Sequence, residues 1–232
     1  MTVGGILGEA WKLYTRFFVI ALIVYLVVNL LNALIGTLFG HGAGIAVLLA
    51  LITLVISIVG TFWLQGALVY AVSDVRDGKI DTTVSQVFER IQPLLGTLIA
   101  AGLLAGLGIA IGFIFVIVPG LVLLTWWCLI VPVIVLEGKQ IGESFTRSRE
   151  LVRGHGWTVF GVVIVSGLLV AISSGIIESI FSFLGSFLRY WIGGSIASAI
   201  VGPFFAVALT LVYYALVEQP AAGTDTVPVS SE

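Results

Sequence analysis

Charged residues are scarce in this sequence. Acidic and basic residues together make up 9% of its 232 residues, whereas a soluble domain carries about 25%. Hydrophobic residues make up 59%, and the mean hydropathy is +1.21. A chain this apolar cannot cover a globule with polar groups, so we expect lipid to be its main solvent. The net charge of −2 is too small to indicate nucleic acid as a partner.

Residues that build catalytic and metal sites are equally rare. Cys128 is the only cysteine, which excludes an intrachain disulfide. The two histidines, His41 and His155, are expected on opposite sides of a membrane, so they cannot share a metal. The sequence contains no HExxH, GxSxG or Walker-type motif. We therefore expect no cofactor, no metal, no catalytic residues and no enzyme activity.

Long apolar runs fill the chain instead. About 20 apolar residues cross a bilayer, and a helix satisfies every backbone group there. These runs predict an all-α, polytopic bundle of six transmembrane helices, in one membrane domain over 1–217, followed by a disordered cytoplasmic tail over 218–232. The first run is too long for a cleaved signal and is expected to be an uncleaved anchor. The six runs are 17–39, 44–72, 94–118, 121–136, 157–183 and 191–217.

The basic residues are divided unequally between the two sides of this layout. Only Arg189 falls on one side, and a membrane protein keeps its lysines and arginines mainly in the cytoplasm. We therefore expect a multi-pass protein of a prokaryotic plasma (inner) membrane with both termini in the cytoplasm. The residues on the cytoplasmic side are Lys12, Arg16, Arg76, Lys79, Arg90, Lys139, Arg147, Arg149 and Arg153.

Three segments between or before the runs have amphipathic spacing. RDGKIDTTVSQVFERIQPLLG (76–96) and LEGKQIGESFTRSRELVRGHG (136–156) share an acid-Gly-Lys start, and ILGEAWKLYTRFF (6–18) resembles their amphipathic part. Each is expected to form a short helix at the membrane interface, followed by a helical hairpin. The chain is then three pseudo-repeats, unless basic amphipathic connectors have converged by chance.

Helix-breaking residues stand inside the apolar stretch around Pro119. Pro119 and Gly120 are expected at the outer turn between the third and fourth spans. Pro132 lies within the fourth span and is expected to kink it. Trp126 and Trp127 lie about 10 Å below the outer end, so we expect at least one ring between helices.

Small and polar residues within the runs are expected to serve helix packing. Asn29 and Asn32 share a face of the first span and can hydrogen-bond across helices. Glu178 is an ionisable residue near the outer end of the fifth span. It either reaches the interface or acts as a carboxylate that contacts a substrate. In the third span, Gly102 with Gly106 and Gly108 with Gly112 have small-xxx-small spacing and are expected to let helices approach closely. Small residues of the fifth span, among them Gly167 and Gly175, are also expected to serve packing.

A basic cluster follows the fourth span. Arg147, Arg149 and Arg153 are candidate contacts for anionic lipid headgroups, although they could also serve only to enforce topology. We therefore expect a membrane protein that organises lipids or partner proteins. The alternative is a small transporter or channel with a polar cavity near mid-membrane, around Gln65, Pro132 and the two asparagines of the first span.

The stretch PGLVLLTWWCLIVPVIVLEGKQIGESFTRSRELVRGHGW (119–157) carries the one family resemblance. It resembles the membrane domain ahead of some bacterial glycerophosphoryl diester phosphodiesterases and of related six-helix inner-membrane proteins. In that family, catalysis resides in a soluble barrel fused to the membrane part, and the resemblance does not extend to that barrel. It implies an integral membrane protein without phosphodiesterase activity.

Overall fold

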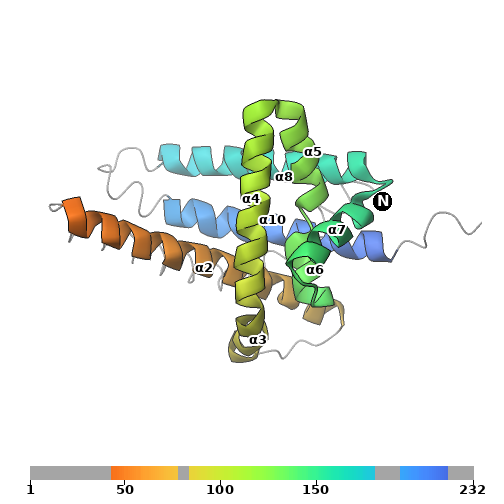
Figure 1. Cartoon of the computed structure of the whole chain (residues 1–232), viewed down its shortest axis with the longest axis horizontal. Coiled ribbons are helices and arrows are strands. Elements are labelled where there is room, and N and C mark those ends of the chain that lie inside the picture. Colours follow the sequence, from red (N-terminus) through yellow and green to blue (C-terminus); the bar gives the residue numbers. More distant parts are fainter. Residues whose placement is uncertain (1–42, 78–83, 181–193, 219–232) are drawn as a thin grey trace, which may run out of the picture.

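The computed structural model describes residues 43–77, 84–180 and 194–218, and all regular structure in these ranges is helical. The all-helical class is thereby confirmed for this part of the chain. The elements are α2 (Ala43–Arg76), α3 (Val84–Ile91), a 3-10 turn (Gln92–Leu94), α4 (Leu95–Phe115), α5 (Ile117–Trp127), α6 (Ile130–Glu137), α7 (Ile141–Val152), α8 (Gly156–Ile180) and α10 (Gly194–Val217), as Figure 1 shows.

Four helical stretches are long and apolar enough to cross a membrane. They are Val55–Asp74, Glu89–Phe115, Ile117–Glu137 and Gly156–Ile177, and a shorter apolar helix covers Pro203–Val217. The four stretches overlap the second to fifth predicted runs, and the shorter helix overlaps the sixth. The first run lies outside the described residues, together with Asn29, Asn32 and the N-terminal amphipathic segment. The count of six spans and the threefold repeat therefore stay predictions.

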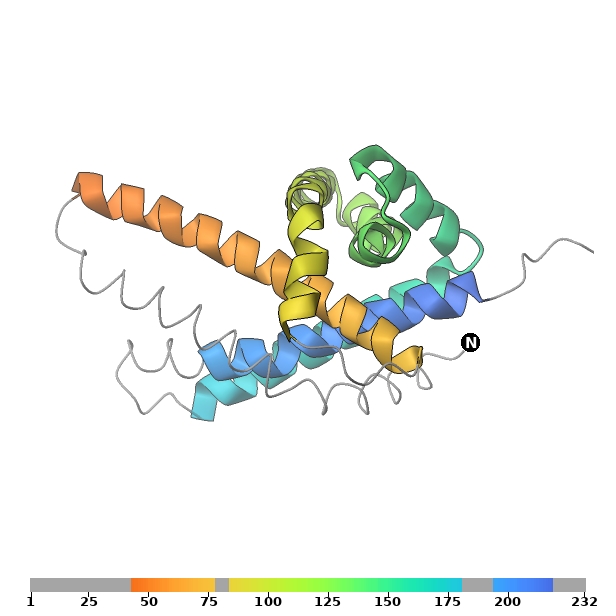
Figure 2. The ribbon, with the colours of Figure 1, turned by 90° about the horizontal axis from the view of Figure 1, so that it is seen from below.

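The hairpin formed by α4 and α5 lies across the other long helices. Figure 1 shows it running crosswise to α2, α8 and α10, and Figure 2 shows the same hairpin end-on. This arrangement differs from a bundle in which all spans lie side by side. Helices that cross steeply touch over a short stretch only, and small residues let them come close. At this crossing a Cβ on Gly102 would overlap the Phe62 ring, so only a glycine fits there without a shift of the ring.

The turn of the hairpin differs in detail from the prediction. A single extended residue, Val116 (φ −159°, ψ 143°), separates α4 from α5. Pro119 lies in the first turn of α5, where its missing N–H has no helical partner to lose. Gly120 is a packing residue rather than part of the turn, because a Cβ there would lie 2.5 Å from the Phe113 ring. Gly112 meets the backbone of Gly120 in the same way, since its Cβ would lie 3.0 Å from the Gly120 Cα.

The fourth predicted span is one membrane-length stretch, Ile117–Glu137, that is interrupted between two helices. α5 ends at Trp127, and α6 begins at Ile130 after the turn residues Cys128 and Leu129. Pro132 consequently lies in the first turn of α6. Pro132 has no N–H to donate to the Cys128 carbonyl, and the regular bonding resumes with the Val133 N–H, which donates to the Leu129 carbonyl at 3.0 Å.

The apolar core is centred on α6. One side of α6 packs with α8 and α10, where Leu129 and Val133 join a buried cluster with residues such as Val162 and Val207. The other side packs with α2, α3 and α4 through Ile130 and Ile134. This eight-residue helix, buried on both sides, thus joins α2, α3 and α4 to α8 and α10. The buried residues of α6 are Ile130, Pro132, Val133, Ile134 and Val135.

Candidate functional site

The polar end of α6 carries a three-residue network. The Glu137 carboxylate accepts hydrogen bonds from Arg147 Nε on α7 at 3.1 Å and from the Tyr213 hydroxyl on α10 at 3.0 Å. Side-chain exposure is 18% for Glu137 and 37% for Arg147, so the pair is only partly open to water. Arg147 also lies 3.9 Å from Glu150 on its own helix. This network joins α6, α7 and α10.

Two further ion pairs join other helix ends. Arg76 at the end of α2 pairs with Glu218 after α10 at 2.6 Å, and its guanidinium lies 4.6 Å from the centre of the Tyr214 ring. Arg90 on α3 pairs with the buried Asp74 on α2 at 3.4 Å. These ionisable groups therefore connect helices to each other instead of converging on one cavity.

The amphipathic helix α7 is held against protein by a polar contact. The hydroxyl of the buried Ser148 donates to the Trp126 carbonyl at 2.6 Å, and Phe145 meets the Trp127 ring edge-on with centroids 5.0 Å apart. At the start of the helix, the N–H of Gln140 donates to the Glu143 carboxylate at 3.4 Å. The inner face of α7 thus packs on α5 and α6, whereas the sequence indicates a face turned only to the membrane interface.

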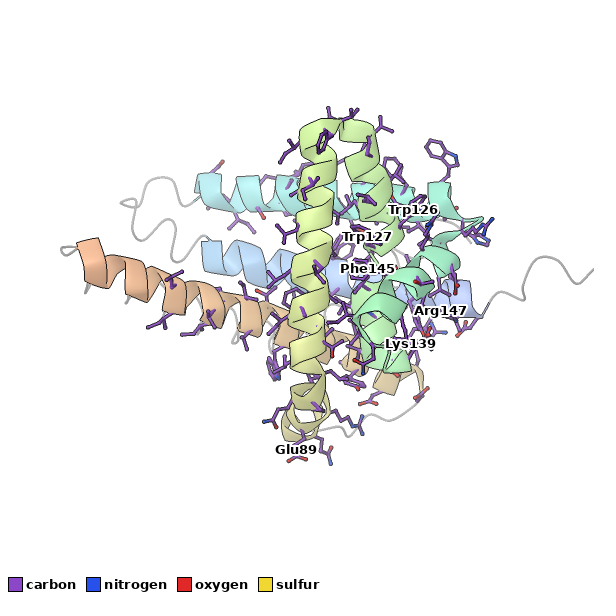
Figure 3. The ribbon with its side chains drawn as sticks, in the orientation of Figure 1. Glu89, Trp126, Trp127, Lys139, Phe145 and Arg147 are labelled. Atoms are coloured by element: carbon purple, nitrogen blue, oxygen red, sulfur yellow. The ribbon has the colours of Figure 1, made fainter. Side chains whose placement is uncertain are left out.

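The three arginines of the predicted basic cluster, Arg147, Arg149 and Arg153, have different surroundings in the structure. Arg147 is engaged by Glu137, as described above. The guanidinium of Arg149 lies 4.3 Å from the centre of the Trp126 ring, and Arg153 is exposed after the end of α7. Figure 3 shows Arg147 with Lys139 toward the lower end of α6 and α7, and Trp126 higher along α5. Only Arg149 and Arg153 are therefore placed to meet a ligand from outside.

A groove of about 520 Å³ lies between α5 and the beginning of α8. Trp126, the ring under Arg149, forms part of its wall. Sequence reasoning missed this groove, although the spacing of the α5 residues is that of one helix face. The lining residues are Val118, Leu121, Val122, Thr125 and Trp126 from α5, Gly154 and His155 from the connection, and Gly156, Trp157, Thr158 and Phe160 from α8.

A smaller cavity of about 170 Å³ lies among α2, α4, α5, α6 and α10. Gln65 and Pro132, two residues of the predicted mid-membrane cavity, both line it. Its wall is otherwise apolar apart from the thiol of Cys128, which donates to the Thr125 carbonyl at 3.1 Å. A cavity is therefore present beside Gln65 and Pro132, as the sequence predicts, but the Gln65 amide supplies most of its polarity.

The remaining candidate residues are separate from these sites. Glu178 belongs to the last turns of α8, and its side chain lies outside the described part. Among the glycines, a Cβ on Gly108 would meet the Trp127 ring at 2.5 Å, whereas one on Gly106, Gly167 or Gly175 would find no atom within 4 Å. Close approach therefore explains some of the predicted small-residue spacings and not others.

No family model, curated protein or solved structure matches this chain. The resemblance carried by residues 119–157 thus stays an expectation from the sequence. Within the described ranges, no three His, Cys, Asp or Glu side chains are placed to hold a metal ion together.

Proposed function

We propose that this chain is a non-enzymatic, multi-pass protein of the plasma membrane that organises anionic lipid, with its basic end on the cytoplasmic side. The observation that carries this proposal is the division of the arginines. Arg76, Arg90 and Arg147 bind acidic partners outside their own helices. Arg149 and Arg153 are exposed, and neither has an acidic partner within 4 Å in the described part of the chain.

The surroundings of these two arginines support a lipid ligand. Arg149 lies on a tryptophan ring, and tryptophan favours the headgroup level of a membrane. Trp157 follows Arg153 closely and is 87% exposed. An arginine near an anionic membrane surface contributes about 1 kcal/mol of binding. An exposed arginine on an indole ring, followed in the sequence by a second exposed arginine and an exposed tryptophan, is thus suited to the phosphate level of a bilayer.

Native mass spectrometry of the purified chain tests this role. The protein is released from micelles containing equal amounts of phosphatidylglycerol and phosphatidylcholine, and the retained lipid is counted. Phosphatidylglycerol should be preferred, and Arg149→Gln with Arg153→Gln should weaken that preference by about five-fold for each arginine. Lys139→Gln is the matched control, because it removes one positive charge before α7 and outside the groove. Equal retention of both lipids by the unaltered protein would contradict the proposal.

A small transporter or channel is the second candidate, and the cavity beside Gln65 and Pro132 is what favours it. The single cysteine of the chain, Cys128, lines this cavity and reports on water there. Because the wall is mostly apolar, we expect it to be dry. A charged methanethiosulfonate reagent should then modify Cys128 in denatured protein but not in liposomes. Rapid modification in liposomes would favour the transporter or channel instead.

A further inference from the structure

One face of α5 forms a continuous trough. The residues that line it recur at positions i, i+3, i+4, i+7 and i+8 from Val118 to Trp126, which corresponds to a length of about 12 Å along the helix. The only hydroxyl on this face, that of Thr125, donates to the Leu121 carbonyl at 2.8 Å. Its polar atom is therefore satisfied within the helix, and the trough presents an apolar wall.

One end of the trough carries a cation, because the Arg149 guanidinium covers the Trp126 ring there. Gly154 and His155 of the connection to α8 line the groove, and the exposed Arg153 directly precedes them in the sequence. This tight connection depends on Gly154, whose φ of +89° favours glycine. The first turn of α8 adds the positive end of a helix dipole. The groove thus combines an apolar α5 wall with a guanidinium, that of Arg149, over its Trp126 end.

This combination has the chemistry of a single anionic lipid. An acyl chain needs an apolar wall without hydrogen-bonding groups, and a phosphate needs nearby cations. A peptide would fit poorly, because its backbone amides would be left without partners along the α5 wall. The volume of about 520 Å³ falls within the roughly 300–1,000 Å³ of small-molecule sites.

We propose that the groove between α5 and the start of α8 holds one acyl chain of an anionic phospholipid, with the lipid phosphate beside Arg149 and Arg153. This site rests on the proposed function, since it assigns a fixed position to lipid that the basic end attracts. It also distinguishes a bound lipid from the general layer of lipid around the protein.

Photocrosslinking in liposomes tests the position. The probes are phosphatidylglycerol and phosphatidylcholine that carry a diazirine in one acyl chain, and labelled peptides are mapped by mass spectrometry. Phosphatidylglycerol should label residues 118–126 and 157–160 at least about three-fold more than the exposed face of α4 at Leu104 and Leu107. Val122→Trp, which fills the trough, should abolish this excess while the preference for phosphatidylglycerol in native mass spectrometry persists.

The two proposals fail in different ways. If phosphatidylglycerol is preferred through the two arginines but labels α4 and α5 evenly, the groove is not its site and only the present inference is overturned. If neither lipid is preferred, the proposed function fails as well. A phosphatidylcholine pattern identical to that of phosphatidylglycerol on α5 would also overturn the inference, because the cationic end would then play no part.

Discussion

Two equally apolar regions of this molecule have opposite surroundings. Around α6, residues such as Ile134 are fully buried by other helices. At the tip of the α4–α5 hairpin, Ile114 and Phe115 are each 80% exposed, and Ile176 near the end of α8 is 57% exposed. The α6 region is held by protein contacts, whereas the hairpin tip and outer α8 have apolar surfaces that only lipid or another apolar partner can cover. Apolar composition therefore shows that a segment avoids water, but it does not distinguish a segment buried in the protein core from one that faces lipid.

The charged residues also differ between the helices around α6 and the exposed face of the hairpin. The described ion pairs join α2 to α3, α6 to α7, and α2 to the residue after α10. The exposed face of the hairpin between Leu103 and Val118 carries apolar side chains and glycines. Substitutions in the two regions should accordingly have very different effects.

The largest difference is expected between two isoleucines. Ile134→Ala removes a buried side chain from the centre of the core and should reduce the free energy of unfolding by about 2–5 kcal/mol. Ile111→Ala, at a position 52% exposed on α4, should change it by no more than about 0.5 kcal/mol. Unfolding in mixed micelles of increasing SDS content measures both. Equal losses would contradict the distinction between core and lipid-facing surface.

The next effect concerns the network at the end of α6. Glu137→Gln removes the charge that binds Arg147 and Tyr213 in a partly buried setting. A hydrogen bond to a charged group contributes about 1.5–3 kcal/mol, so a loss toward the lower end of that range is expected in the SDS titration. Arg147→Gln in the same background should then add little, because its partner has already lost its charge. Fully additive losses would show that the pair does not act as a unit.

Two glycines of α4 test whether close packing holds the hairpin together. Gly112→Ala places a Cβ against the Gly120 backbone and should destabilise the hairpin by about 1–3 kcal/mol. Gly106→Ala meets no atom within 4 Å and should stabilise α4 by roughly 0.5–1 kcal/mol through its higher helix propensity. The SDS unfolding titration measures the stability of both variants. Opposite signs are expected, and destabilisation by both would mean that a further partner covers Gly106.

The smallest effect is expected at the exposed pair between Arg76 and Glu218. The Glu218 side chain is 59% exposed, and surface ion pairs contribute about 0–1 kcal/mol. Glu218→Gln should therefore lower stability by less than about 1 kcal/mol, and 0.5 M salt should remove the difference. A loss as large as that of Glu137→Gln would place this pair within the core network.

Sequence alone predicted most of the described helices, because long apolar runs and the 3.6-residue period are properties of local sequence. It predicted a disturbance of the helix from Pro132, and the break at Cys128 and Leu129 lies one turn before that proline. The binding of α7 through Ser148 was not predicted, since a serine hydroxyl finds the Trp126 carbonyl only in the folded chain. The crossing of the α4–α5 hairpin over the other long helices was not predicted either, because it also depends on contacts between distant parts of the chain.

The candidate site was predictable only in part. Arg147, Arg149 and Arg153 are close in sequence and carry the same charge, so no local pattern separates them. Their separation depends on Glu137, ten residues away, and on Tyr213, which contacts Glu137 across 76 residues. The groove was missed because an apolar stripe on α5 has the same sequence pattern as any helix face turned to lipid.

The central claim is that lipid covers the projecting apolar segments while protein covers α6. A nitroxide on Leu107→Cys, in a Cys128→Ala background and in liposomes, tests it most directly, with Arg153→Cys as the comparison site. The account predicts that oxygen, which concentrates in lipid, relaxes the label at position 107 more than a water-soluble nickel chelate does, and that the order is reversed at position 153. Stronger relaxation by the nickel chelate at position 107 would place the hairpin in water and contradict the account.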